Sequence, residues 1–407
     1  MDWFWGAGPM PFAVRSVMDS RSVFIVDWLR GEASMTALCV RHGISRKTGY
    51  ATIARYQAGG FAGLAPRSRA RVRPPERIAA AQASALLGLR DRHPTWGPRK
   101  LLARLRREDP AASWPAASTA GDLLVRESRV RPRRRRGDCG AGGAIELVEP
   151  VSPNASWSAD FKGWFRTGDG VRCEPFTVTD GFSRYLLICD PVPQVSCEAV
   201  RPLMEGVFRE YGLPVALRMD NGPPFGRRDG LAGLTQFSVW LLMLGVFPDF
   251  IKPGRPDMNA RHERMHLVLQ QDTASPPAAT LAAQRERLAA WRRTYNDERP
   301  HEALEQRCPA AVYRRSERAY PGSVTAWEYP ADHQVLAVIG DGYINWRGER
   351  LYLSGALRGH RVALAQRDDG DWAVRFRGFD LAVVGEASRA LAAHRLRRTP
   401  ADPPSGR

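Results

Sequence analysis

The sequence predicts a multidomain α/β protein: helical modules come first, an α/β core follows, and a small antiparallel β-barrel comes last. Three observations lead to this prediction. Helical patterns with a surplus of basic charge fill the first third, strands alternate with helices after Trp157, and short strands of alternating polarity follow Val335. The length of 407 residues favours two to four domains, because a single core rarely grows that large.

The basic charge is concentrated at the front of the chain. The 60 Lys and Arg against 43 Asp and Glu give a net charge of +17, and residues 1–150 alone carry 26 basic and 13 acidic side chains. Such a surplus must face solvent, a surface or a polyanion. Arginine dominates, which suits bidentate contacts to phosphate and guanine, although a GC-rich genome produces the same bias. We therefore expect the front end to bind nucleic acid.

Residues 18–70 are expected to form a helix-turn-helix domain. Two short helices are predicted within residues 34–56, with a tight turn at Gly43 and Ser45 as the N-cap of the second helix. The start of the second helix is where a recognition helix contacts base edges. The expected small core contains Leu38, Val40, Ile44 and Ile53. The expected DNA contacts are Arg46, Lys47, Thr48 and Tyr50.

Further basic segments surround a second helical DNA-binding module, predicted over residues 71–130. A basic, proline-rich stretch precedes it and is typical of a linker that follows a phosphate backbone. Inside the module, residues 97–107 predict a basic helix, and Ser118 or Thr119 could cap another. Residues 131–150 predict a flexible basic linker. The sequence favours neither of two roles for this linker, direct contact with DNA or solubilising the segment between domains. The DNA contacts expected in these segments are Arg67, Arg69, Arg99 and Lys100.

The α/β core is predicted over residues 151–315. The expected strands are residues 156–165, 174–192, 214–222 and 246–253, and the expected helices are residues 197–212, 234–245, 259–272 and 280–295. Phe237 and Trp240 follow one apolar helix face and are expected in the core. The barrel is predicted over residues 325–390, and the polar residues 396–407 are expected to be a disordered tail.

Three carboxylates in the core are the candidate catalytic residues. Asp160 and Asp220 stand where strands should end, and Asn221-Gly222 permits a sharp turn that leaves Asp220 accessible. Glu263 lies near the start of a helix, on one face with Asn259 and His266 by helical spacing. Converging carboxylates repel one another, and a hard divalent cation offsets that repulsion. We therefore expect two Mg²⁺ or Mn²⁺ ions, which activate a nucleophile and stabilise the leaving oxygen in phosphodiester chemistry.

Four ordered motifs, WSADFKG, RMDNGPPF, NARHERMH and YNDERPHEAL, carry a resemblance to a known family. They resemble the catalytic core of bacterial insertion-sequence transposases related to retroviral integrases, and the resemblance covers roughly residues 35–315. It implies a ribonuclease-H-like integrase core, which is an α/β fold with a mixed sheet, and an acidic D-D-E triad. It also implies metal-dependent DNA cleavage and strand transfer at the ends of a mobile element. The implied partners are double-stranded DNA, both element ends and target, and further copies of the chain assembled on that DNA.

The resemblance implies that the triad is Asp160, Asp220 and Glu263, which are also the expected metal ligands. The two gaps contain 59 and 42 intervening residues. The second gap is longer than in the shortest integrases of this type, so Asp257, with 36 intervening residues, is the rival third ligand. We favour Glu263, because Asp257 follows Pro256 in a loop before the helix begins.

Other polar residues near the triad have supporting roles or structural ones. Asn221, Asn259 and His266 are expected to orient the ligands or contact DNA, although capping and turn roles fit the asparagines equally well. Asp180 is expected to be a turn residue with Gly181. His262 and His266 could equally be helix-surface residues, and Arg299 and His301 are expected only to fasten the chain after the core. The expected contacts to the DNA backbone are Lys162, Arg261 and Arg264.

Several classes of protein are excluded. The six cysteines include no CxxC pair, so neither a zinc site nor a disulfide framework is expected. The longest apolar run, near Phe237 to Phe247, is too short to cross a bilayer, and the first 18 residues do not resemble a signal peptide. We therefore expect a cytoplasmic, nucleoid-associated bacterial protein with no membrane partner and no small-molecule substrate.

Two other functions compete with that of a transposase. One is a DNA-binding protein that has lost catalysis, and the other is a nuclease that hydrolyses DNA without joining strands.

Overall fold

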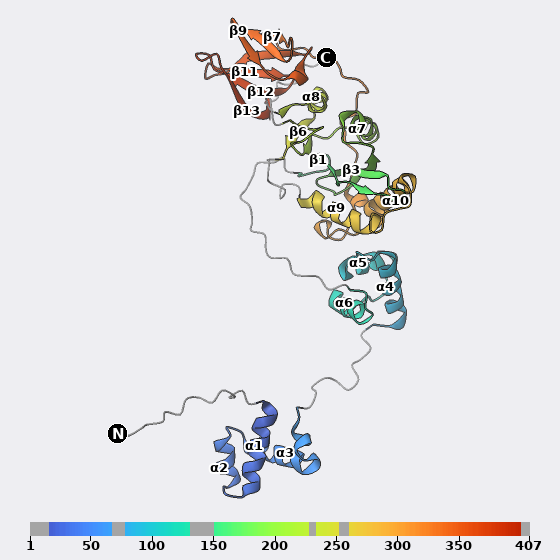
Figure 1. Cartoon of the computed structure of the whole chain (residues 1–407), viewed down its shortest axis with the longest axis vertical. Coiled ribbons are helices and arrows are strands. Elements are labelled where there is room, and N and C mark those ends of the chain that lie inside the picture. The colour runs from blue at the N-terminus through green and yellow to red at the C-terminus, as the bar shows by residue number, and fades with distance from the viewer. Residues whose placement is uncertain (1–15, 67–77, 131–149, 228–232, 252–259, 400–407) are drawn as a thin grey trace, which may run out of the picture. The chain divides into compact units, whose positions relative to one another are not determined.

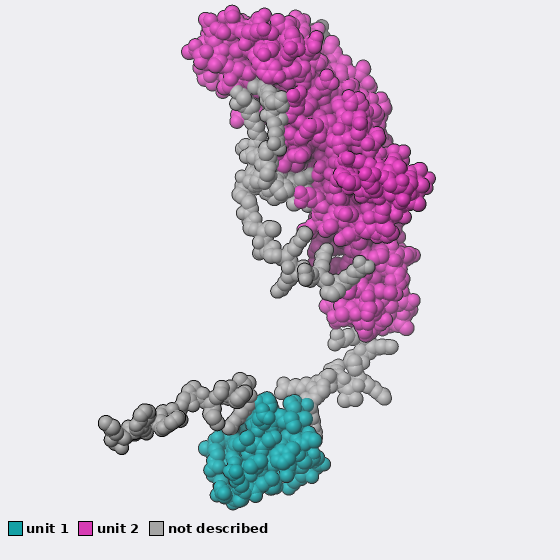
Figure 2. All heavy atoms as spheres, in the orientation of Figure 1, with its two compact units in different colours: residues 1–77 teal, residues 78–407 magenta. Residues whose placement is uncertain are grey.

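The chain forms two compact units, residues 1–77 and residues 78–407, shown in teal and magenta in Figure 2. The structure is a computed structural model that describes residues 16–66, 78–130, 150–227, 233–251 and 260–399. Within these ranges, no helix combines the length and the apolar character needed to cross a membrane. Figure 1 labels helices of both units and many of the strands.

The first unit is a small helical domain that contains the predicted helix-turn-helix. Its elements are α1 (Val17–Arg30), α2 (Met35–Arg41), α3 (Arg46–Gly59) and a 3₁₀ helix (Phe61–Leu64). The Ser45 hydroxyl accepts the backbone N–H of Thr48 at 3.2 Å, so it caps α3 as predicted. Gly43 makes the preceding turn with a φ of 63°, a conformation that favours glycine.

The core of the first unit differs from the expected one at a single position. Leu38 and Ile53 are buried as predicted, together with Phe24 and Ile25 of α1. Val40 is 77% exposed, because it lies on the outer face of α2 and not on the face that packs against α3. The prediction of a core role for Val40 was wrong.

The second unit begins with the predicted second helical module. Its helices are α4 (Ala80–Arg92), α5 (Pro98–Glu108) and α6 (Ala117–Arg126). Leu101, Leu102 and Leu105 lie on the buried face of α5. The basic helix is therefore where the sequence predicts it. Ser118 and Thr119 lie inside α6, because the N-cap position is Ala116, so their predicted capping role is wrong.

The centre of the second unit is a six-stranded mixed sheet. Its strands are β1 (Ser156–Phe161), β2 (Phe165–Arg166), β3 (Arg172–Asp180), β4 (Leu186–Val192), β5 (Ala216–Met219) and β6 (Phe247–Phe250). The order is β2-β3-β1-β5-β6, and β4 pairs with β3. The β1–β3 and β3–β4 pairs are antiparallel, whereas β1–β5 and β5–β6 are parallel. This confirms the predicted α/β core with a mixed sheet.

Helices cover both faces of the sheet. They are α7 (Cys197–Tyr211), α8 (Gln236–Met243), α9 (Ala260–Thr273) and α10 (Leu281–Arg293). One face packs against α7 and α8 in a core that includes Trp157, Phe237 and Trp240, so the predicted core role of the last two is confirmed. The other face carries α9 and α10, which lie side by side in Figure 1 and share a smaller core with β4.

The C-terminal residues form antiparallel β-structure. The strands are β7 (Gln334–Ala337), β8 (Tyr343–Trp346), β9 (Glu349–Tyr352), β10 (Arg361–Gln366), β11 (Trp372–Phe376), β12 (Phe379–Val384) and β13 (Leu391–Arg398). They make a five-stranded sheet in the order β13-β12-β11-β10-β7 and a separate β8–β9 hairpin. In the described part of the chain the sheet does not close, so the predicted barrel is only partly right. Strand β13 reaches Arg398, which corrects the prediction that the disordered tail begins at residue 396.

Candidate active site

Asp160 and Asp220 lie at the same level on neighbouring parallel strands. In the β1–β5 pair, Ser156 lies beside Ala216 and Ser158 beside Arg218. Two residues further along each strand are Asp160, near the end of β1, and Asp220, directly after β5. Side chains two residues apart on a strand point to the same face. The register therefore directs both aspartates to one face of the sheet.

That face is the one covered by α9. The alternate residues Trp157 and Ala159 of β1 belong to the core shared with α7 and α8, so Asp160 points to the opposite side. Thr177 of β3 pairs directly with Asp160. Thr177 and Thr179 bond to histidines of α9, which identifies the helix that packs over this face. The catalytic candidates thus lie between the sheet and α9.

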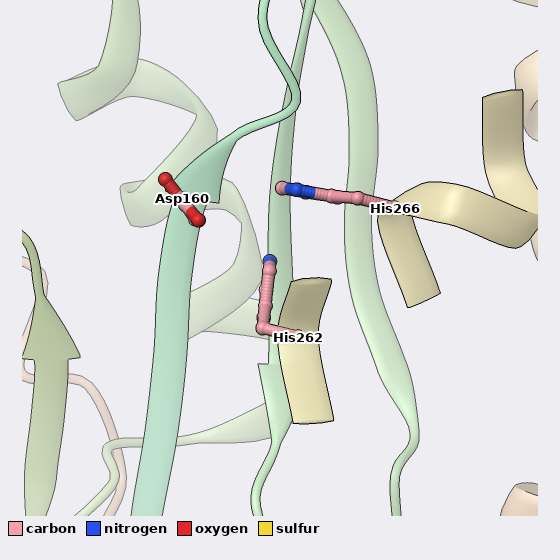
Figure 3. Close-up of side chains that lie close together, drawn as sticks. All are labelled: Asp160, His262 and His266. Carbon is pink, nitrogen blue, oxygen red and sulfur yellow. The ribbon is translucent and has the colours of Figure 1, made fainter. Parts of the chain in front are cut away.

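Two histidines of α9 reach into this region. His262 Nε2 and His266 Nε2 both lie 2.7 Å from the hydroxyl of Thr177, and His262 Nδ1 lies 2.9 Å from the hydroxyl of Thr179. Figure 3 shows both imidazoles projecting from α9 toward the strands, near Asp160. The side chains are 2% and 7% exposed, so these are not the helix-surface residues that the sequence allowed. They are four residues apart, about one helical turn, which puts both on the buried face.

One arrangement of protons satisfies every contact of the Thr177 hydroxyl. In it, the hydroxyl donates its single proton to the carbonyl oxygen of Asp160 at 3.1 Å and accepts from both histidines through Nε2–H. Burial lowers the pKa of His262 well below its usual value, and the neighbouring His266 lowers it further. Burial, reinforced by the charge of Lys162, lowers the pKa of His266 to about 3, so both rings are neutral at pH 7.

The described residues contain one set of three side chains whose ligand atoms lie within 4.8 Å of one another: Asp160, His262 and His266. A metal ion binds an imidazole through an unprotonated nitrogen, so an ion held by this set would replace the bonds between the Nε2 atoms and Thr177. The histidine pair holds strand β3 beside Asp160 by hydrogen bonds.

Asp220 and Glu263 lie outside this set, and both are exposed. Asp220 Oδ1 accepts the backbone N–H of Asn221 at 2.7 Å, just as Asp160 Oδ1 accepts that of Phe161 at 2.8 Å. Glu263 lies in the first turn of α9, one residue after His262. One residue is about 100° of helical rotation, so Glu263 lies at the edge of the buried face and differs in exposure from His266.

Sequence reasoning missed a buried ion pair beside the aspartates. Arg218 of β5 donates to Asp249 of β6 from Nε and Nη2, at 3.1 and 3.0 Å. Asp249 is 3% exposed and Arg218 9%. Both lie on the face that carries Asp160 and Asp220, because Arg218 is two residues before Asp220. Nothing in the spacing of the two residues in the sequence indicates that β5 and β6 are neighbours.

Asp180 and Arg299 have the structural roles that the sequence predicts. Asp180 is fully buried, and its Oδ2 accepts the backbone N–H of Ser183 at 2.7 Å and its hydroxyl at 2.6 Å. Burial raises the pKa of Asp180. Asp180 is therefore a turn residue and no fourth ligand. Arg299 is 6% exposed and lies 3.9 Å from Asp272 at the end of α9, so it fastens the chain after the core.

The predicted DNA contacts fall into exposed and partly buried groups. Those of the helix-turn-helix, and Arg261 and Arg264 at the start of α9, are exposed. Arg99 is exposed but pairs with Glu302 at 2.5 Å. Lys100 and Lys162 are half-buried, and burial together with the charge of Arg299 lowers the pKa of Lys100 to about 8. The candidates that lie outside the described residues are Arg67, Arg69, Asp257 and Asn259.

The cysteines give no sign of a metal or disulfide framework. Five of them lie in the described part of the chain, and all five are free thiols. Four are buried and Cys197 is half-buried. Burial raises the pKa of Cys173 to about 11, so this thiol stays protonated. The cysteines that the structure describes are therefore free thiols that are wholly or partly buried.

A large cleft opens beside Asp220. Its volume is about 1160 Å³. One wall comes from the core and includes Asp220, Asn221 and Gln236, and the other comes from the C-terminal β-structure and includes Tyr352 and Ser354. Asn221, which was predicted to support the ligands, therefore faces the same space as Asp220. The cleft exceeds the roughly 300–1,000 Å³ of a small-molecule pocket and suits a polymer better.

Family models match most of the chain between residues 24 and 309. Residues 150–256 match an integrase core domain model, and residues 244–309 match a second model with the same description. Residues 24–71 match a helix-turn-helix domain, and residues 48–124 match a homeodomain-like domain. These matches coincide with the mixed sheet and with the helical modules that precede it.

Two curated proteins of bacterial insertion elements are similar to this chain. The uncharacterized 31.7 kDa protein of insertion element IS407 from Burkholderia multivorans (strain ATCC 17616 / 249) is 31% identical over 231 residues, which cover 56% of this chain and 79% of that protein. The uncharacterized 39.2 kDa protein of insertion element IS476 from Xanthomonas euvesicatoria is 28% identical over 285 residues, which cover 70% of this chain and 79% of that protein.

Solved structures of viral integrases are also similar. One is a chain of the simian T-cell lymphotropic virus intasome in complex with PP2A regulatory subunit B56 gamma, with a TM-score of 0.36 and 13% identity, covering 78% of this chain and 100% of that one. Another is the HTLV-2 integrase catalytic core domain in complex with magnesium, in its trimeric form. Its TM-score is 0.31 at 13% identity, and the match covers 40% of this chain and 99% of that one.

Proposed function

The chain belongs to the bacterial insertion-sequence transposases of the integrase superfamily, and we propose that its catalytic residues are Asp160, Asp220 and Glu263. It is a transposase, an enzyme that cleaves and transfers DNA strands at the ends of a mobile element. The observation that carries the proposed triad is the β1–β5 register, which directs two aspartates from neighbouring parallel strands to one face of the sheet. Glu263 is the carboxylate at the start of the helix that covers this face.

The donor set fits a hard divalent cation. Carboxylate oxygens are the ligands that Mg²⁺ and Mn²⁺ prefer, and Asp220 and Glu263 are exposed to solvent from which such an ion would come. We propose two ions held by the three carboxylates. When bound, the ions supply Lewis-acid stabilisation of the phosphodiester and lower the pKa of the attacking water or 3′-hydroxyl.

The protein's own residues position the first ligand and bind the DNA. The Thr177–His262–His266 network joins strand β3 and α9 to the main-chain carbonyl of Asp160 and so holds the backbone that carries this carboxylate. Arg261 and Arg264 flank Glu263 on the exposed side of α9, where they can neutralise phosphates of the bound strand. Lys162 lies two residues after Asp160, where it can also neutralise a phosphate of the bound strand.

The helix-turn-helix supplies the DNA-binding surface away from the catalytic site. Arg46, Lys47, Thr48 and Tyr50 are exposed on the first turns of α3, where a recognition helix contacts base edges. We propose that this helix binds the ends of the mobile element. Two ends must be held together before they are joined to a target, so the proposed active form is an assembly of several copies on DNA.

Carboxylate-to-amide variants test the triad. Asp220→Asn, Asp160→Asn and Glu263→Gln should each lower the rate of cleavage about 1,000-fold, because losing several kcal/mol of charge stabilisation costs a factor of ten for every 1.36 kcal/mol. Their affinity for DNA in the absence of metal should match that of the wild type. Asp257→Asn is the matched control, because it removes the rival third ligand and should retain activity.

A strand-transfer assay separates a transposase from a nuclease of the same chemistry. The substrates are a DNA end with a free 3′-hydroxyl and a target plasmid, with Mg²⁺ or Mn²⁺. Joined product is the expected result. An active Asp220→Asn variant would refute the triad. If Glu263→Gln kept full activity and Asp257→Asn lost activity, the third ligand would be Asp257.

A further inference from the structure

The β8–β9 hairpin presents an aromatic and basic face to solvent. Tyr343 lies opposite Tyr352, and Asn345 lies opposite Arg350. Because side chains alternate along a strand, these four residues share one face of the hairpin. The other face carries Ile344, which is fully buried in the core of the C-terminal β-structure. The hairpin therefore packs into the hydrophobic core through its other face, and the two tyrosines are not needed for that packing.

The side chains of this face form a compact cluster. The rings of Tyr343 and Tyr352 have centroids 5.1 Å apart, and the guanidinium of Arg350 lies 4.2 Å from the centroid of the Tyr343 ring. Tyr352 is 44% exposed, although its neighbours Leu351 and Leu353 are buried. Unpaired nucleobases stack on aromatic rings, and the phosphates between them bind cations. This exposed surface carries both kinds of group, together with an amide.

Tyr352 also lines the cleft that contains Asp220. The cleft has Asp220, Arg227 and Gln236 on its core side, and Tyr352 and Ser354 on the hairpin side. A strand that passes Asp220 through this cleft therefore meets Tyr352. The volume of about 1160 Å³ leaves room for a stretch of strand beyond the phosphate at Asp220.

The hairpin side of the cleft is anchored to the core side. Val239 and Leu242 of α8 are buried in the same apolar core as Ile344 and the C-terminal sheet. Arg377 donates to the carbonyl of Met243 at 2.6 Å, and Arg398 donates to that of Val215, directly before β5, at 2.8 Å. The distance between Tyr352 and Asp220 is thus set by packing and by direct hydrogen bonds, as a binding site requires.

We propose that the exposed face of the β8–β9 hairpin is a stacking platform for unpaired bases of the DNA strand whose phosphodiester lies at Asp220. Tyr352 stacks on a base, and Arg350 neutralises an adjoining phosphate. Stacking is tolerant of sequence, because every base has a π face, so the platform selects separated strands over paired ones. The proposal rests on the proposed function in one respect, the identity of the strand at Asp220.

Fluorescence of a base analogue tests the platform without any catalysis. The full chain is mixed, in EDTA and at moderate salt, with a duplex of mixed sequence that carries 2-aminopurine in a single-stranded 3′ overhang. Stacking on Tyr352 should quench the fluorescence. Tyr352→Ala should abolish the quenching and weaken binding of a single-stranded oligonucleotide about 5- to 150-fold, the effect of losing one base–aromatic stack. Tyr352→Phe keeps the ring and should behave as the wild type.

Two controls make the result specific. Trp327→Ala removes an aromatic side chain of similar exposure, 48%, that does not line the cleft, and should leave the quenching unchanged. A blunt duplex with 2-aminopurine at an internal, paired position should give no change. Quenching by Tyr352→Ala equal to that of the wild type would overturn the proposal, as would an equal response from the blunt duplex. Because no metal is present, these outcomes do not depend on whether the carboxylate triad is correct.

Discussion

Thr177 lies directly opposite Asp160 in the β1–β3 pair, and its hydroxyl donates to the Asp160 carbonyl oxygen at 3.1 Å. The same hydroxyl lies 2.7 Å from Nε2 of two buried imidazoles, so one threonine joins two strands and a helix at the first candidate ligand. A single oxygen with three partners uses its whole hydrogen-bonding capacity. The backbone at Asp160 is thus held by a side chain that is not itself a candidate ligand.

Thr177→Val should destabilise the protein and slow catalysis. Valine has nearly the same shape but leaves two buried Nε2–H donors without an acceptor, and each costs about 1–3 kcal/mol. We expect a lower urea midpoint and slower cleavage, with DNA binding unchanged in EDTA. Thr177→Ser restores the hydroxyl and should recover most of both losses. Equal stability of Thr177→Val and the wild type would show that the network does not brace the strand.

The Arg218–Asp249 pair predicts a second, separable effect on stability. Both side chains are almost fully buried, so Asp249→Asn removes the charge that Arg218 Nε and Nη2 face, and breaking a buried pair in this way costs about 3–5 kcal/mol. The double variant Arg218→Met/Asp249→Leu removes both charges and should lose much less. Denaturant unfolding of the wild type, Arg218→Met, Asp249→Leu and the double variant gives the coupling between the two residues. Additive losses in the double variant would contradict this prediction.

Local signals explain which features the sequence predicts well. The Ser45 cap and the Gly43 turn depend on neighbouring residues only, so α2 and α3 appear where they are expected. The strand–helix alternation likewise predicts β1 and β5, because each is a short apolar run that ends at an aspartate. The failures are non-local. The placement of Ser118 and Thr119 inside α6 depends on how α6 packs on α5, and a polar residue alone does not fix a helix start.

In the candidate site, too, the sequence predicts what depends on neighbouring residues and misses what depends on packing. Two candidate ligands, Asp160 and Asp220, follow from strand ends, but the burial of His262 and His266 depends on α9 packing over β3, which the periodicity of α9 alone does not reveal. Helical spacing predicts that His266 shares a face of α9 with Glu263, whereas in the structure His266 shares the buried face with His262. The open C-terminal sheet has the same cause, because alternating strands predict antiparallel pairing but not whether the edge strands meet.

Arg46 and Lys47 should account for part of the salt dependence of DNA binding. Each neutralised phosphate contributes about 0.9 to the slope of log affinity against log salt concentration, so Arg46→Ala/Lys47→Ala should reduce the slope by about 1.8 and weaken binding. Fluorescence anisotropy over a range of NaCl concentrations measures it. Arg30→Ala in α1 is the matched control, because Arg30 is exposed but lies outside α3. Unchanged affinity of the double variant would refute the recognition-helix assignment.

His301 should make the protein less stable as the pH falls below neutrality. Its Nε2 is buried without a hydrogen-bond partner. Burial, reinforced by the positive charges of Lys100 and Arg299, lowers the pKa of His301 to about 3. The unfolded chain has the usual histidine pKa of about 6.5, so between these two pKa values the unfolded state binds a proton that the folded state does not. Stability is therefore complete above about pH 6.5 and is lost progressively as the pH falls toward 3.

The loss is measurable well above the folded pKa. One proton corresponds to about 1.4 kcal/mol per pH unit, so His301 alone should lower the free energy of unfolding by about 2 kcal/mol between pH 6.5 and 5. His301→Gln keeps a polar side chain but cannot titrate, and its stability should fall by that much less over the same interval. Urea midpoints at pH 7, 6 and 5 compare the two proteins. Since the other histidines are common to both, parallel pH curves would mean that His301 is protonated as readily in the folded protein as in the unfolded chain.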